Sequence, residues 1–118
     1  MPRVLFVDDS AVARAMAERL FSEAGVAVTT AASSSEAARI DPGSVCAALL
    51  DVELGDGLGT DLARLLRRDC PRLPIAFLTS AERTAVLDEA RALGPVFMKT
   101  SEVEAAVRWA AEKAAGSG

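Results

Sequence analysis

Four apolar runs of strand length, each followed at once by polar residues, constrain this sequence more than any other feature. The runs cover residues 4–7, 47–50, 75–78 and 96–98. The polar residues that follow them are Asp8 and Asp9, Asp51, Thr79, and Lys99. Nearly continuous apolar runs are typical of a parallel sheet covered on both faces, and ligands of such sheets bind beyond the carboxyl ends of the strands. We therefore expect these polar side chains to meet at one edge of a sheet.

The segment after the first run predicts a helix and then an edge strand. Ser10 is placed to cap this helix and Gly25 to end it. The apolar residues at helical spacing between them are Val12, Met16, Leu20 and Ala24. Residues 26–31 alternate and are less apolar, which suits a strand with one face in water.

Two further helices are expected on either side of the second apolar run. Ser33 and Glu36 have capping-box spacing before a short helix that should reach about Ile40. After Asp51 and a glycine-rich loop, Thr60 or Asp61 can cap the next helix. Its inward residues are expected to be Leu62, Leu65 and Leu66. Its outward residues, expected to form a solvated face, are Arg64, Arg67 and Arg68.

The last two helices follow the third and fourth runs. One is predicted from Glu82 to Leu93, with Val86, Ala90 and Leu93 facing inward. Thr100 or Ser101 can cap the other. Its buried stripe is predicted to be Val103, Val107, Ala110 and Ala114. Trp109 lies off this stripe and should be partly exposed, either as part of an interface or as a ring over the edge of the core.

Five strands that alternate with five helices predict an α/β fold, because each crossover must be right-handed and return parallel. The weak second strand belongs at an edge. This favours a flavodoxin-like three-layer sandwich with a five-stranded parallel sheet in the order 2-1-3-4-5. That order places the ends of the first and third strands side by side. We expect a single domain over residues 1–115 and a flexible tail over residues 116–118.

The composition excludes several classes of function. The chain of 118 residues has a net charge of −4, which argues against direct binding of nucleic acid. No apolar run approaches the roughly 20 residues that span a membrane, and the start lacks a secretory signal, so we expect a cytoplasmic protein without membrane contact. The two cysteines are far apart and there is no histidine, which argues against a zinc site. Any phosphohistidine would have to belong to a partner.

The acidic residues that should converge predict a metal site. Three carboxylates within a few ångströms raise one another's pKa unless they share a cation. An open site with oxygen ligands and neither histidine nor cysteine suits Mg²⁺, which keeps water ligands and accepts phosphate oxygens. Phosphoryl transfer needs an oxygen nucleophile, a metal and a cationic group. Asp51, the metal and Lys99 could supply these.

The order Asp8-Asp9, Asp51, Thr79 and Lys99, each at a strand end, resembles the receiver domain of bacterial two-component response regulators over the whole chain. The resemblance implies that Asp51 is the phosphoacceptor and that Asp8, Asp9, Asp51 and the Glu53 backbone carbonyl bind Mg²⁺. It also implies that Thr79 binds the phosphoryl group, that Lys99 pairs with it, and that a histidine kinase or histidine phosphotransfer protein is the donor. Phosphorylation would bias the face formed by the fourth helix, fifth strand and fifth helix toward a protein partner or self-association.

The sequence departs from the family pattern at four positions. Gly55 replaces a usual proline in the loop after Asp51, and Leu58 replaces an aspartate. Val96 stands where an aromatic residue is expected, with Phe97 one place later, so the aromatic relay to the output face is altered. Thr100 replaces the proline after Lys99. Because a cis bond before a non-proline residue costs about 2.5–4 kcal/mol, we expect a trans bond there or a strained exception.

Several alternatives remain open on the sequence. Asp8 or Asp9 could cap the first helix, Asp51 could be a turn residue, Thr79 a strand former and Lys99 a solvated edge residue. The chain could be a receiver that acts alone or the amino-terminal receiver of a longer protein. A pseudo-receiver would bind partners without phosphorylation. A flavin-binding flavodoxin relative would need a phosphate loop after the first strand, where the aspartates would repel phosphate.

Overall fold

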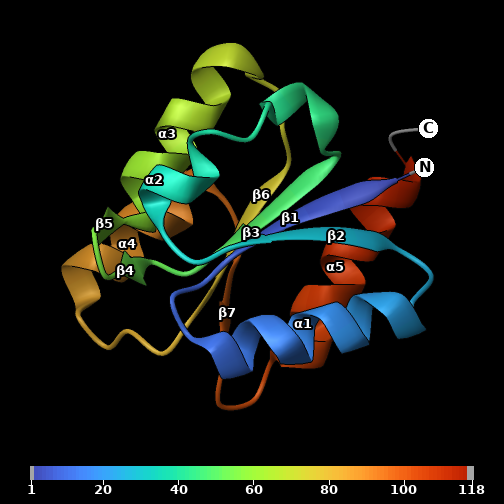
Figure 1. Cartoon of the computed structure of the whole chain (residues 1–118). Helices are drawn as coiled ribbons and strands as arrows, with labels where there is room; N and C mark the ends of the chain where they lie inside the picture. The colour runs from blue at the N-terminus through green and yellow to red at the C-terminus, as the bar shows by residue number, and fades with distance from the viewer. Residues whose placement is uncertain (1, 117–118) are drawn as a thin grey trace.

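The computed structural model describes residues 2–116 and has a parallel sheet at its centre (Figure 1). The strands of this sheet are β1 (Arg3–Val7), β2 (Ala27–Ala31), β3 (Ala47–Leu50), β6 (Ile75–Thr79) and β7 (Val96–Met98). Their order is β2-β1-β3-β6-β7 and all four pairings are parallel. Counted along the main sheet, this is the predicted order 2-1-3-4-5, with the less apolar β2 at an edge. The flavodoxin-like fold is therefore confirmed.

Helices cover both faces of the sheet, as the apolar strands predict (Figure 1). On one face lie α1 (Ala11–Glu23) and α5 (Val103–Gly116). On the other lie α2 (Ser34–Ala37), α3 (Gly59–Asp69) and α4 (Thr84–Leu93). The strands supply alternate residues to the two cores, so that Leu50 and Phe77 face one and Leu49 and Leu78 the other. None of the helices in residues 2–116 has the length and apolar character needed to cross a membrane.

The buried face of α1 is one residue out of step with the predicted stripe. The residues buried against the sheet are Ala13, Ala17 and Phe21, whereas Val12 is 80% exposed, Leu20 is only partly buried and Ala24 is exposed. Two apolar stripes lie next to each other on this helix, about 100° apart in an α-helix of 3.6 residues per turn. Burial of the large Phe21 ring decides between them. The predicted ends are correct, because Ser10 accepts from the Ala13 amide and Gly25 has a φ of 74°.

Helix α3 begins earlier than predicted. It starts at Gly59 without a side-chain cap, so Thr60 and Asp61 lie in its first turn and neither caps it. Leu65 is 41% exposed, and Ala63 is buried in its place. The small alanine faces the sheet because a short side chain allows the close approach of the helix, while the two other predicted leucines fill the core on either side.

Arg67 is not simply solvated. It is partly buried, and its guanidinium donates to the carbonyl oxygens of Leu73 at 3.2 Å and Leu93 at 2.7 Å. The remaining helix ends differ by a few residues: α2 stops at Ala37, α4 starts at Thr84, and α5 starts at Val103. Neither Thr100 nor Ser101 immediately precedes α5. Every peptide bond in residues 2–116 is trans, including the one between Lys99 and Thr100.

A two-stranded ribbon follows β3 and was not predicted. It pairs β4 (Glu53–Leu54) with β5 (Gly57–Leu58) in antiparallel register, with Gly55 and Asp56 at its tip. Leu54 is buried in the core beneath α3 and α4, with 6% exposure. The ribbon therefore holds the loop after β3 against the body of the domain. At the other end of the chain, Gly116 belongs to α5, and the rest of the expected tail, Ser117 and Gly118, lies outside the described residues.

Candidate functional site

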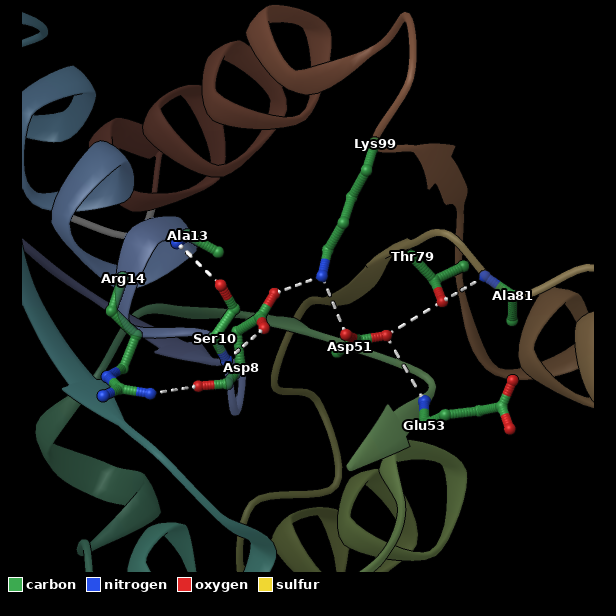
Figure 2. A network of polar contacts seen from close by, with 9 residues as sticks. All are labelled: Asp8, Ser10, Ala13, Arg14, Asp51, Glu53, Thr79, Ala81 and Lys99. Atoms are coloured by element: carbon green, nitrogen blue, oxygen red, sulfur yellow. Dashed lines mark hydrogen bonds and ion pairs between the residues drawn. The ribbon is translucent and has the colours of Figure 1, made fainter. Parts of the chain in front are cut away.

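Four predicted site residues lie together at the carboxyl edge of the sheet (Figure 2). The parallel register pairs Val7 of β1 with Leu50 of β3, so Asp8 and Asp51 follow side by side. Asp8 is 1% exposed and Asp51 is 6% exposed. Two carboxylates buried next to each other are costly unless positive charge and hydrogen bonds compensate them. The surrounding residues supply both.

Lys99 lies between the two carboxylates. Its Nζ is 2.6 Å from Oδ2 of Asp8 and 2.9 Å from Oδ2 of Asp51. Burial by itself would lower the pKa of Lys99, but the hydrogen bonds and charges of Asp8 and Asp51 outweigh it and raise the pKa above its usual value. The ammonium therefore stays charged at neutral pH. Its side chain is 23% exposed, so the solvated-edge alternative is wrong.

Asp51 is oriented by donors from two other elements. Its Oδ1 accepts the Thr79 hydroxyl at 2.8 Å and the Glu53 amide at 3.3 Å. The same Thr79 oxygen accepts from the Ala81 amide at 3.0 Å, so this hydroxyl can point its proton only toward the carboxylate. Thr79 is fully buried. Its hydroxyl has a role beyond strand formation, and Asp51 is more than a turn residue.

Asp8 and Asp9 do not cap α1, because Ser10 does so. The Ser10 hydroxyl accepts from the Ala13 amide at 3.2 Å, while Oδ1 of Asp8 accepts from the Ser10 amide at 2.9 Å. Arg14 donates to the backbone carbonyl of Asp8 at 2.9 Å. Sequence reasoning missed this contact, which fixes the peptide that carries the acidic pair. Asp9 is exposed beside it.

The acidic residues fit a hard divalent cation. One carboxylate oxygen from each of Asp8, Asp9 and Asp51 lies within 4.8 Å of the others. Oδ2 of Asp8 is buried and faces the Lys99 ammonium at 2.6 Å, a cation position that a metal ion bound to these carboxylates would share. Oxygen donors of this kind suit Mg²⁺, which keeps several waters when only two or three carboxylates bind it. Glu53 follows at the rim of the same pocket.

The pocket over Asp51 is open to solvent and has a volume of about 530 Å³. It is bounded on one side by Glu53 and on the other by the segment from Thr79 to Glu82. Arg83 and Glu53 form an exposed ion pair of 3.1 Å across this rim. The two residues are 30 positions apart and neither follows a motif, so the sequence offered no signal for the pair. A group the size of a phosphoryl can reach Asp51 here.

Gly59 lets the start of α3 approach the site. A Cβ at this position would lie 1.9 Å from the backbone oxygen of Asp51, which no real Cβ can do. The Gly59 amide donates to the Val52 carbonyl at 2.7 Å, which closes the loop after β3. The absence of a side chain at Gly59 therefore sets how Asp51 and the ribbon lie relative to α3.

The fold and the acidic residues at the carboxyl edge of the sheet define a class of parallel α/β domain. Solved structures of that class are similar to this chain. A CheY-like response regulator receiver domain protein from Methanospirillum hungatei JF-1 has a TM-score of 0.83 at 21% identity, over 100% of this chain and 99% of that chain. The receiver domain of HemR from Leptospira biflexa has a TM-score of 0.82 at 25% identity, over 94% of each chain. Chemotaxis protein CheY4 of Vibrio cholerae has a TM-score of 0.70 at 28% identity, over 83% of this chain and 84% of that chain.

Within this class, the sequence itself identifies the family. Residues 4–113 match the response regulator receiver domain, and the chain belongs to that family. No curated protein matches the sequence. The predicted resemblance is therefore confirmed at the level of family and fold.

Proposed function

We propose that this domain accepts a phosphoryl group on Asp51 from a phosphohistidine of a partner protein and signals through protein contacts. One observation carries the proposal: the buried Asp51 carboxylate ends the central strand and is held at once by Lys99 at 2.9 Å and Thr79 at 2.8 Å. An acid that only ended a strand would not need a cation and a hydroxyl placed on its two oxygens. This one is fixed by a cation and a hydroxyl at the floor of an open pocket, as an oxygen nucleophile must be.

In the proposed reaction an oxygen of Asp51 attacks the phosphorus of the donor. A P–O bond forms as the P–N bond breaks, and the bonding pair leaves with the imidazole nitrogen, which takes up a proton from solvent. The nucleophilic oxygen gives up one of its present hydrogen-bond partners. Lys99 then pairs with the phosphoryl oxygens, and the Thr79 hydroxyl, freed from the carboxylate, donates to one of them.

Asp8, Asp9, Asp51 and the Glu53 backbone carbonyl are proposed to hold Mg²⁺. When bound, the ion would neutralise charge that builds up on the phosphoryl oxygens. The convergence of one oxygen from each of Asp8, Asp9 and Asp51 within 4.8 Å of one another supports this assignment. Because the same groups would also serve hydrolysis, the domain is proposed to catalyse both its own phosphorylation and its dephosphorylation.

The donor is proposed to be a histidine kinase or a histidine phosphotransfer protein, because this chain contains no histidine. The output surface is proposed to be the face of α4, β7 and α5, which lies beside Thr79 and Lys99. A pseudo-receiver that works without phosphorylation is favoured by Val96 and Thr100, which depart from the family pattern. The intact set of Asp51, Thr79 and Lys99 argues against it.

The test is the intact mass of the protein after incubation with Mg²⁺ and a small acyl phosphate. We expect the mass of one added phosphoryl group, which alkali removes, and no addition to Asp51→Asn. Asp69→Asn, which changes an exposed acid on α3, is the matched control and should label like the wild type. Labelling of Asp51→Asn at the wild-type rate would contradict the assignment. A wild type that never labels but still binds its partner would favour the pseudo-receiver.

A further inference from the structure

The ribbon after β3 has a polar anchor away from the acidic site. At its tip, Asp56 accepts from the Ser34 amide at 2.9 Å through Oδ1 and from the Ser35 amide at 3.0 Å through Oδ2. These amides begin α2, where the Ser33 hydroxyl accepts from the next free amide, that of Glu36, at 3.1 Å. Hydrogen bonds from Ser34 and then Ser35 hold the pKa of Asp56 below its usual value of 3.8. The carboxylate is therefore a charged, two-point contact between segments 21 and 22 positions apart.

Leu54 anchors the base of the ribbon in the core, but the other supports of its tip are weak. Glycines flank Asp56 on both sides, and Gly57 has a φ of 159° that other residues rarely adopt. Helix α3, which follows directly, begins with no side-chain cap. The Glu53–Arg83 ion pair is 45% and 64% exposed, and exposed pairs contribute little.

The ribbon carries groups that touch the acidic cluster. The Glu53 amide donates to Oδ1 of Asp51 at 3.3 Å. A Cβ placed on Gly55 would lie 3.6 Å from Oδ2 of Asp9, so the tip of the ribbon lies near that carboxylate. A displacement of the tip would move both contacts together. The position of the ribbon therefore affects the groups that would surround a cation.

We propose that Asp56 is a positioning residue for the Mg²⁺ site: by tying the β4–β5 ribbon to α2, it holds Glu53 and Gly55 against the acidic cluster. The inference rests on the proposed function only in its metal site. It also makes α2 part of the support of that site.

The test compares the Mg²⁺ dissociation constant, measured by calorimetry at fixed ionic strength, across three variants. Asp56→Ala removes the contact, and we expect about a 3- to 10-fold weaker affinity, at or below the low end of what loss of an outer partner costs a metal site. Asp56→Asn loses the same charge but keeps one acceptor oxygen, so it should recover part of the affinity. Comparing these two variants separates the effect of the contact on Mg²⁺ affinity from the effect of losing a negative charge.

The third variant, Ser34→Pro, removes one of the two bonds of the contact, the one from the Ser34 amide, and changes no charge. Proline suits the first turn of a helix, and Ser33 before it is extended, with φ −153° and ψ 164°. We expect weaker Mg²⁺ binding here too. Adding Asp56→Ala to Ser34→Pro should then cost less than Asp56→Ala costs alone, because the bond from Ser34 is already absent and only the one from Ser35 remains to be lost.

Amide exchange at Ser35 and melting in a chelator verify that each variant is folded and that the contact is lost. Variants that lose Ser35 protection but keep the wild-type dissociation constant would overturn the proposal. So would equal losses in Asp56→Ala and Asp56→Asn with none in Ser34→Pro, since charge alone would then explain them. A wild type that binds Mg²⁺ in this Asp56-dependent way but takes no phosphoryl group supports the inference and rejects the proposed function. A wild type that binds no Mg²⁺ overturns both.

Discussion

The Thr79 hydroxyl donates to Oδ1 of Asp51 at 2.8 Å, and both residues are buried at adjacent strand ends. The same hydroxyl accepts from the Ala81 amide, so β3, β6 and the loop before α4 are joined through one oxygen atom. A change in the charge or size of the group on Asp51 would act directly on this hydroxyl, as it would on Lys99 and on the Glu53 amide. Thr79 is therefore the point from which a signal at Asp51 can enter the loop before α4.

Replacement of Thr79 by valine should destabilise the domain by about 1–3 kcal/mol, because it leaves the Ala81 amide and a buried carboxylate oxygen short of a partner. Thr79→Ser, which keeps the hydroxyl and loses one methyl group, should cost about 1 kcal/mol. Urea unfolding without Mg²⁺ measures both. Equal losses in the two variants would show that packing, and not the hydroxyl, matters at this position.

Lys99→Met should destabilise the metal-free domain by about 1–3 kcal/mol, because Asp8 and Asp51 then lie buried without a cation. It should also increase the stabilisation that Mg²⁺ provides, since the ammonium no longer competes for the same carboxylates. The measurement is the melting temperature of wild type and variant with and without millimolar Mg²⁺. Asp9→Asn should remove most of the Mg²⁺ effect in either background. If Mg²⁺ raised the melting temperature of Lys99→Met no more than that of the wild type, the ammonium and the metal would not compete for the same carboxylates.

The contribution of Lys99 should depend on pH only in alkali. Its pKa is raised in the folded state, so its stabilisation is fully present below the ordinary lysine value of 10.5 and is lost as the pH rises through the higher folded value. The difference in unfolding free energy between wild type and Lys99→Met, without metal, should be constant from neutral pH to about 10 and shrink above it. A difference that already fades near pH 8 would mean that the pKa is not raised.

Gly59→Ala should destabilise the domain by at least about 1–3 kcal/mol, because a Cβ there overlaps the backbone oxygen of Asp51 and the start of α3 must shift. Phosphorylation by an acyl phosphate should slow in parallel. Gly116→Ala is the matched control, since nothing lies within 4 Å of its Cβ position, and it should be neutral in both assays. Wild-type stability of Gly59→Ala would show that the helix start adapts freely.

The carboxyl group of Asp56 should titrate below 3.8 when followed by NMR, because the amides of Ser34 and Ser35 favour its charged form. A lowered folded pKa means that the contact is present above pH 3.8 and is lost as the pH falls through the lower folded value. Ser34→Pro should bring the titration back toward the ordinary value. An Asp56 that titrates at or above 3.8 would show that the contact is not kept in solution.

Coupling from Asp51 to α5 should be weak in this domain. Val96 packs with the core under α3 and α4, whereas Phe97 packs with the core under α1 and α5, so Phe97 cannot take over the role of an aromatic side chain at Val96. Val96 is also small and stiff. With a beryllofluoride mimic of the acyl phosphate, NMR shift changes should be largest from Thr79 to Ala81 and at Lys99. Changes of equal size from Val96 to Arg108 would show that this coupling is intact.

The sequence by itself determined the layout of the domain. Continuous apolar runs are local patterns that predict buried parallel strands, and a polar residue at each strand end marks one edge. The weaker pattern of residues 26–31 is enough to place β2 at the side. These features allowed Asp8, Asp51, Thr79 and Lys99 to be brought together before any contact was known, because parallel strands align their carboxyl ends.

Only the tertiary structure decided which of two apolar stripes α1 buries, since the packing of Phe21 against the sheet has no local sequence signal. It also decided that α3 starts at Gly59, because that start depends on contact with the backbone of Asp51. The hydrogen bonds between Asp56 and Ser34 and between Arg67 and Leu93 join residues 22 and 26 positions apart. Such contacts follow from how the loops and helices meet in space, and periodicity along the chain carries no information about them.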